Sequence, residues 1–185
     1  MKPLMKIKDV FWDKDNLLQE AKSLEKTCLI LGTQGNTVKL VPMNERTPCL
    51  LKFYKDFEKK YDNNLGEVSV SYMYINAEET TTREIENNPK DIQCVFNILL
   101  LGDKNKVEFK DVGEFSYNKA AILNTPHMHR AVSSTDIILC CIGFRDLSYE
   151  EVICKVKSKI NSWHREDNMP MIYESPDKGK TVYER

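Results

Sequence analysis

The chain has 185 residues, of which 41% are hydrophobic and 30% are charged, and its 27 basic and 28 acidic residues leave a net charge of -1. These values are typical of one globular domain with its own core, and they give no electrostatic argument for binding nucleic acid or an anionic membrane. The amino terminus lacks the apolar segment of a signal peptide, and the longest apolar run, Ile137–Phe144, is too short to cross a bilayer. The six cysteines form no CxxC pair, so we expect reduced thiols in a cytoplasmic protein.

The first third of the chain predicts two helices. Apolar residues recur at helical spacing in Asp13–Lys26 and again in Cys49–Tyr61. Asp13 or Asp15 is placed to cap the first of these helices. Between the helices, two short apolar runs flank the sequence TQGN, which predicts a hairpin.

The rest of the chain predicts strands, because the apolar period changes from about four residues to two. Six strands are expected, at Glu67–Ile75, Gln93–Leu101, Lys106–Phe109, Ser116–Leu123, Pro126–Val132 and Asp136–Phe144. A closing helix is expected over Ser148–Trp163. We therefore predict a mainly β protein with flanking helices (α+β), folded as a sandwich or barrel in one domain, residues 1–166, followed by a loose tail, residues 167–185.

Two of the three histidines stand one residue apart in the sequence LNTPHMHRAV. If Pro126–Val132 is one strand, His127 and His129 project from the same face, where their imidazoles can share one metal ion. The alternative is that one ring is a buried, hydrogen-bonded core residue and the other lies at the rim. At the open end of a barrel, either arrangement would face the place where barrels bind ligands.

The segment that contains these histidines resembles part of a known family. The sequences FNILLLGDKNKVEFKD, YNKAAILNTPHMHRAV and SSTDIILCCIGFRDLSYEEV follow one another as in the C-terminal half of the 2-oxoglutarate- and Fe(II)-dependent oxygenases, and most closely in small phage- and virus-type members. The resemblance covers about a third of the chain. It implies a double-stranded β-helix (jelly-roll, cupin-like) barrel and places His129 at the distal metal histidine of the family.

The chain departs from this family at two functional positions. The family holds its iron with two histidines and one carboxylate, of which the first histidine and the carboxylate form an upstream HxD pair. Here the upstream segment contains no histidine and reads TTTRE where HxD is expected. The family also places an Arg or Lys on the strand after the distal histidine to bind the 2-oxoglutarate carboxylate, whereas DIILCCIGF contains no basic residue. Arg130 and Arg145 flank that strand and are the candidate cofactor-binding residues.

A different ligand set would still allow a metal. His127 and His129 can combine with a carboxylate from the charged segment EETTTREIE, which we expect to be a loop and in which Glu78 and Glu84 are the candidate ligands. The candidate cofactors are therefore Fe(II) or another divalent metal, and 2-oxoglutarate.

Four further residues are candidates to line the pocket, namely Tyr72, Tyr74, Asn97 and Cys140. The two tyrosines alternate along a strand, so their rings either line a groove or pack against the helix Cys49–Tyr61. Of the adjacent cysteines, one is expected to point into the barrel, either as a nucleophile paired with His129 or as a small buried apolar residue.

Three functions are compatible with these features. The first is a divergent 2-oxoglutarate/Fe(II) oxygenase-like protein with weak, altered or lost hydroxylase activity, and the incomplete HxD motif favours loss of catalysis. The second is a non-catalytic β-helix protein that binds a partner protein or a small-molecule ligand. The third is a cupin-like metal-binding protein that does not use 2-oxoglutarate. The composition, rich in Lys, Asn and Ile, and the small size suggest a phage or viral gene, which would place the protein in a host cytoplasm.

Overall fold

The computed structural model describes residues 2–7, 12–33, 36–61, 65–76, 80–83, 92–127 and 129–156. Two α-helices, α1 (Lys14–Leu24) and α2 (Pro48–Tyr61), and a 3-10 turn, η1 (Glu25–Thr27), lie in the first third of the chain. Residues 149–156 form a further helix. The strands are β1 (Leu4–Ile7), β2 (Leu29–Thr33), β3 (Asn36–Pro42), β4 (Val68–Ile75), β5 (Thr80–Arg83), β6 (Cys94–Leu101), β7 (Asn105–Phe109), β8 (Gly113–Tyr117), β9 (Ala120–Asn124), β10 (His129–Val132) and β11 (Ile137–Phe144).

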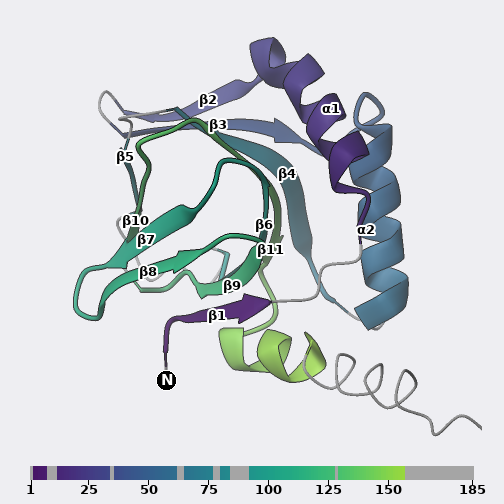
Figure 1. Ribbon diagram of the computed structural model, residues 1–185. Coiled ribbons are helices and arrows are strands. Elements are labelled where there is room, and N and C mark those ends of the chain that lie inside the picture. Colours follow the sequence, from purple (N-terminus) through teal and green to yellow (C-terminus); the bar gives the residue numbers. More distant parts are fainter. Residues whose placement is uncertain are drawn as a thin grey trace, which may run out of the picture.

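The strands form two antiparallel sheets that face each other (Figure 1). The larger sheet has seven strands in the order β1-β9-β6-β11-β4-β3-β2, and the smaller has four in the order β5-β10-β7-β8. Strands that are consecutive in the chain alternate between the two sheets from β4 to β7 and again from β9 to β11. This arrangement is that of a jelly-roll barrel, as predicted.

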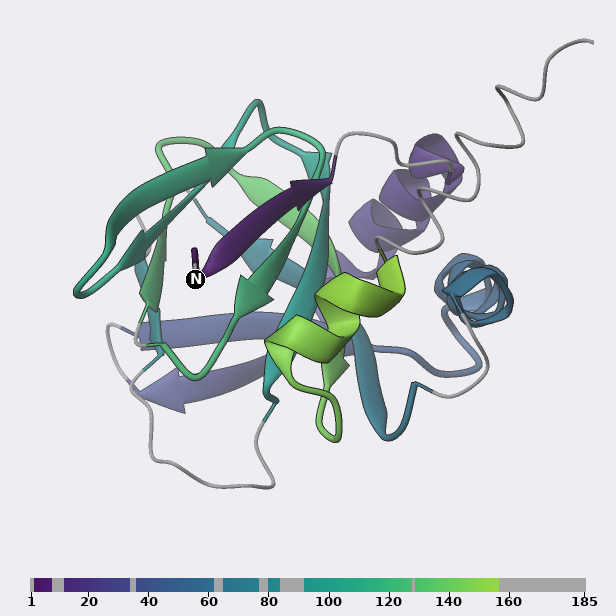
Figure 2. The ribbon, with the colours of Figure 1, turned by 90° about the horizontal axis from the view of Figure 1, so that it is seen from below.

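The central strands β6 and β11 of the larger sheet are buried on both faces, which explains their continuous apolar sequences. One cluster of buried side chains lies between the sheet and the helices, where Leu17 of α1 and Phe57 of α2 meet Phe96 of β6. A second cluster lies inside the barrel, between the two sheets, and includes Leu139 of β11 and Phe109 of β7. Figure 2 shows α1 and α2 on one side of the barrel, away from the four-stranded sheet. The larger sheet of the barrel therefore packs against helices α1 and α2, and the smaller sheet lies on the side away from them.

Most sequence predictions of elements are confirmed, and the differences concern the smaller sheet. The expected loop EETTTREIE contains strand β5, and the expected strand Ser116–Leu123 is two strands, β8 and β9, separated by a turn. Strand β10 begins at His129, three residues later than predicted. Strand β1 was not predicted. The closing helix is described as far as residue 156, and the predicted tail lies outside the described residues.

In the described part of the chain, no helix combines the length and apolarity needed to span a bilayer.

Candidate functional site

The ring of His129 lies at one end of the barrel and faces its interior. In the register of the smaller sheet, His129 stands directly opposite Phe109 of β7. Residues opposite each other in an antiparallel pair point to the same face, and the Phe109 side chain, 1% exposed, belongs to the cluster inside the barrel. The two ring centroids are 5.5 Å apart with the planes tilted by 38°. His129 therefore lies on the inward face of the smaller sheet, whereas the expectation placed both imidazoles, those of His127 and His129, on that face.

The orientation of this ring is fixed by a hydrogen bond to the backbone. Nδ1 of His129 lies 2.7 Å from the carbonyl oxygen of His127, and a carbonyl oxygen only accepts, so Nδ1 carries the proton. In the neutral ring the lone pair is then on Nε2. Histidines that bind metals are commonly held in this way, with one nitrogen donating to a carbonyl.

His127 has a different position from the one its spacing predicted. It precedes β10, in a turn in which its backbone N–H donates to the carbonyl of Asn124, and its side chain is exposed. Strand alternation therefore does not apply to it. The turn is anchored by Thr125, 2% exposed, whose hydroxyl donates to the carbonyl of Ile92. His127 thus contributes its backbone carbonyl, which orients the ring of His129.

The strand that pairs with β10 on its other side is β5, and Arg83 stands opposite His129. The resemblance places the HxD motif of the oxygenases in this segment, and β5 reads TTTR there, without a histidine or a carboxylate. Among the described residues, no three His, Cys, Asp or Glu side chains converge as a metal site. Glu78 and Glu84 lie outside the described residues, so their role as ligands stays a prediction. The described residues thus supply one oriented histidine, and they do not supply the two histidines and one carboxylate with which the family holds iron.

The strand expected to carry the 2-oxoglutarate anchor presents only apolar or small residues to the barrel. Along β11, the inward positions are Ile137, Leu139, Cys141 and Gly143, and the first three belong to the buried cluster inside the barrel. No cation on this strand could pair with a carboxylate there. A carboxylate buried without a partner carries a large desolvation cost. The inward face of β11 therefore does not fit the dicarboxylate cofactor of the family.

A side chain also lies against β11 at Gly143. A Cβ at Gly143 would lie 2.8 Å from Cδ1 of Ile92, which is closer than atoms approach in folded proteins. Ile92 is held in place because the next residue, Gln93, donates its backbone N–H to the carbonyl of Phe144 over 2.8 Å. Glycine at 143 thus leaves the space that the Ile92 side chain occupies.

The polar groups inside the barrel lie on three strands. Asn105 of β7 donates from Nδ2 to the hydroxyl of Tyr117 on β8 over 2.7 Å, and Asn97 of β6 also hydrogen-bonds to this hydroxyl. Burial raises the pKa of Tyr117, and the two amides partly oppose that shift. The Oδ1 atoms of Asn97 and Asn105 are buried, and neither has a hydrogen-bond partner among the described residues. Asn97 is a predicted pocket residue, whereas Asn105 and Tyr117 are not, because β7 begins one residue before its predicted start and β8 lacks strict alternation.

The other three predicted pocket residues lie on the helix side of the larger sheet. The Tyr72 hydroxyl donates to Glu20 of α1 over 2.8 Å, and the Tyr74 hydroxyl donates to the carbonyl of Ala21 over the same distance. The alternative in which tyrosines pack against a helix therefore describes them, although the helix is α1. Cys140 belongs to the same helix-side cluster, and its neighbour Cys141 is the cysteine inside the barrel. Burial raises the pKa of both thiols, which keeps them neutral and argues against a thiolate nucleophile.

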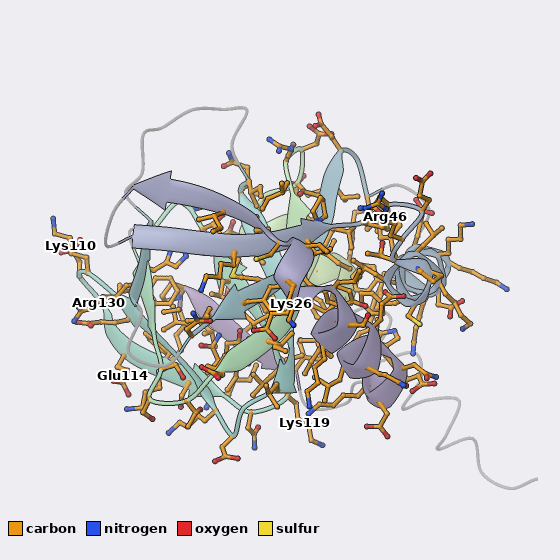
Figure 3. The ribbon with its side chains drawn as sticks, turned by 90° about the horizontal axis from the view of Figure 1, so that it is seen from above. Lys26, Arg46, Lys110, Glu114, Lys119 and Arg130 are labelled. Carbon is orange, nitrogen blue, oxygen red and sulfur yellow. The ribbon has the colours of Figure 1, made fainter. Side chains whose placement is uncertain are left out.

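The two predicted cofactor-binding arginines form ion pairs on the surface. Nη2 of Arg130 lies 2.5 Å from the carboxylate of Glu108, on the outer face of the smaller sheet and away from the helices (Figure 3). Nε of Arg145 lies 3.2 Å from the carboxylate of Glu67, just beyond the end of β11. Arg130 thus points away from the face that carries His129.

Comparisons with known proteins give matches at the level of structure. No protein-family model matches the chain, and no curated protein does. A prolyl-4-hydroxylase from Pseudomonas putida superposes with a TM-score of 0.59 at 6% identity, covering 79% of this chain and 94% of that one. A prolyl hydroxylase from Trichoplax adhaerens, solved with a peptide fragment of the hypoxia-inducible factor oxygen degradation domain, gives 0.58 at 9% identity, with 82% and 86% covered. A 2-oxoglutarate-Fe(II) oxygenase family protein from Burkholderia pseudomallei gives 0.46 at 10% identity, with 71% and 79% covered.

The two hydroxylases show that the chain has the oxygenase type of double-stranded β-helix fold. At these identities the likeness concerns the fold alone. Within that fold, His129 stands opposite Phe109 on the inward face of the smaller sheet, β5 pairs with β10 beside it, and β11 carries no basic residue.

Proposed function

We propose that this protein is a divergent member of the oxygenase-type β-helix group that no longer turns over 2-oxoglutarate and that acts by binding a partner protein or a small ligand at the barrel mouth. The inward face of β11 carries this proposal. Where the family needs a cation, Leu139 and Cys141 are packed in an apolar cluster with no charged neighbour on their strand.

The polar cluster deep in the barrel supports the same conclusion. Its two unpaired atoms, Oδ1 of Asn97 and Oδ1 of Asn105, are both acceptors. A buried acceptor without a partner costs about 1–3 kcal/mol, so these atoms favour a hydrogen-bond donor such as water or a neutral ligand. A carboxylate would add two more acceptors and increase the imbalance.

A metal-binding protein that does not use 2-oxoglutarate is the second candidate. The hydrogen bond from Nδ1 of His129 to the carbonyl of His127 favours it, because it leaves the lone pair of the neutral ring on Nε2. A divalent metal there would supply Lewis acidity or a structural link, and Glu78 or Glu84 would have to complete its ligands. A phage or viral origin, with a host protein as the partner, also stays a prediction.

One set of preparations tests both candidates. Protein purified without chelator is assayed for bound metal and is then incubated with Fe(II), ascorbate and 2-oxoglutarate while succinate is measured. We expect no succinate above the level of the His129→Ala variant, and 2-oxoglutarate binding weaker than about 1 mM by calorimetry. Succinate formation that depends on His129 would overturn the proposal.

The metal assay separates the second candidate through a pair of variants. If metal binds at Nε2 of His129, His129→Ala loses it, whereas His127→Ala retains it because that change preserves the backbone carbonyl. Loss of metal in both variants would instead identify both imidazoles as ligands, and metal retained in His129→Ala would rule out this site.

A further inference from the structure

Among the residues that the structure describes, strand β2 pairs only with β3 and forms an edge of the larger sheet. It pairs with β3 in antiparallel register, from Leu29 opposite Leu40 to Thr33 opposite Asn36, and it is the last strand in the sheet order. Figure 1 shows it at the margin of the sheet, beside β3. The outward row of backbone N–H and C=O groups of an edge strand is a template for another extended chain.

The other three edge strands carry a charged residue, and β2 does not. The described edges are β1, with Lys6; β5, with Arg83; and β8, with Glu114. Charged side chains and prolines on edge strands prevent unwanted pairing in natural proteins. The sequence of β2, LILGT, contains neither, and the whole stretch from residue 28 to residue 38 is uncharged.

The side chains at the start of β2 are apolar and exposed on both faces of the sheet. Leu29 is 55% exposed and Ile30 is 64% exposed, and consecutive residues of a strand point to opposite faces. An apolar patch on one face would suit a helix or a loop. Apolar side chains on both faces suit a strand that continues the sheet, because the side chains of the added strand then cover both.

We propose that β2 pairs with β2 of a second copy of this chain, so that the two seven-stranded sheets form one continuous sheet across a two-fold axis. A two-fold axis relates identical strands in antiparallel orientation, which matches the rest of the sheet. An uncharged strand meets its own copy without repulsion between like charges, and a net charge of -1 per chain opposes association only weakly.

The nearest cation to β2 along the chain is compatible with this pairing. Lys26 lies in the 3-10 turn that leads from α1 into β2 (Figure 3). With the axis at the middle residue of β2, the two copies of Lys26 precede opposite ends of the paired strands, and a strand of five residues is about 16 Å long at 3.3 Å per residue. That length exceeds the screening length of roughly 8 Å at physiological salt, so the two charges do not oppose the contact.

Sedimentation equilibrium of the full chain between about 5 and 500 µM tests the pairing. We expect a reversible monomer–dimer equilibrium whose dissociation constant rises at least tenfold both in Ile30→Lys and in Leu29→Lys, because the lysine puts two like charges at the paired edge. Ile30 stands opposite Lys39 within the chain, whereas Leu29 stands opposite Leu40, so Leu29→Lys excludes repulsion inside the β2–β3 pair as the cause. The matched control is Val112→Lys. Val112 is 49% exposed in the turn between β7 and β8, so this variant adds the same charge away from β2 and should dimerise like the parent.

Hydrogen exchange of the parent protein gives a second readout that needs no variant. The amides of β2 should exchange more slowly at 500 µM than at 5 µM, while those of β8 stay unchanged. A chain that remains monomeric throughout, or a Val112→Lys variant that weakens association as much as Ile30→Lys, would overturn the proposal. The proposal would also be overturned if the chain stays monomeric and its β2 amides become protected only when an unrelated peptide is added. None of these outcomes depends on what the barrel mouth binds.

Discussion

At the scale of single residues, the Ile92 side chain occupies the space where a Cβ at position 143 would lie. Because a Cβ at 143 would lie 2.8 Å from Cδ1 of Ile92, Gly143→Ala forces that side chain or the strand to move. Overpacking of this kind typically costs about 1–3 kcal/mol. We expect the free energy of unfolding of Gly143→Ala, measured by chemical denaturation, to fall by that amount.

The matched test removes the other partner of the contact. Ile92→Ala alone should destabilise the protein by leaving a gap, but it should also make room for the methyl group of Gly143→Ala. The double variant is then more stable than the sum of the two single effects by about 1 kcal/mol or more. Purely additive losses would show that Ile92 does not fill the space above Gly143.

At the scale of elements, one carboxylate joins α1, α2 and β4. Glu20 of α1 accepts hydrogen bonds from the backbone N–H of Cys49 over 2.7 Å and of Leu50 over 3.0 Å, at the start of α2, and from the Tyr72 hydroxyl over 2.8 Å. The first N–H groups of a helix have no partner within the helix, and a negative charge there is favourable. Glu20 thus caps a helix that begins 28 residues after it, at Pro48.

Removal of this cap should loosen the helix layer. We expect Glu20→Ala to lower the free energy of unfolding by about 1–3 kcal/mol, because two backbone donors and one buried hydroxyl lose their acceptor. Glu20→Gln should lose less, since its amide oxygen still accepts. Glu45→Ala, at an exposed position just before α2, is the control and should change stability by less than about 0.5 kcal/mol. Equal effects of Glu20→Ala and Glu45→Ala would show that the cap contributes nothing specific.

The elements that the sequence predicted best are those whose burial leaves a local pattern. Strand β11 is buried at all eight positions, and β4 alternates between the two clusters, so both are visible as apolar runs. Strand β5, with the sequence TTTR, has no such run and is a strand because it pairs with β10. That pairing joins residues about fifty positions apart, and a single sequence does not contain the register.

The candidate site also has features that depend on the residues of one strand and features that depend on the folded arrangement. His129 and the lack of a basic residue on β11 were apparent from the sequence, because they depend on residue types in one strand. The exposed position of His127 was not, because it depends on where the turn at Asn124 ends and β10 begins. The choice between Cys140 and Cys141 needed the direction of the strand relative to the barrel, which only the three-dimensional packing supplies.

At the scale of the whole molecule, the buried tyrosine hydroxyls and the Cys94 thiol predict how the stability of the fold changes at alkaline pH. All six tyrosines in the described part of the chain have a raised pKa, first because burial disfavours the phenolate. The pKa of Tyr61 and that of Tyr149 are each raised from 10.0 to about 12. Burial also raises the pKa of the Cys94 thiol above its ordinary value of 9.0. These groups hold their protons in the folded state at pH values where the unfolded chain has released them.

The sign of the effect follows from this difference in bound protons. Below about pH 9 these groups are protonated in both the folded and the unfolded chain, and their contribution to stability is fully present. This contribution is lost as the pH rises from the pKa of the unfolded chain to that of the folded chain. A group that titrates at 10 unfolded and near 12 folded lowers the free energy of unfolding by about 1.4 kcal/mol per pH unit in that interval. We therefore expect Tm, measured by circular dichroism, to change little from pH 7 to 9 and to fall steeply above 10. Tyrosine absorbance at 295 nm, measured on a Tyr173→Phe/Tyr183→Phe variant that keeps only the six described tyrosines, should rise together with unfolding. Ionisation of these tyrosines near pH 10 while the fold stays intact would contradict the tight packing of both clusters.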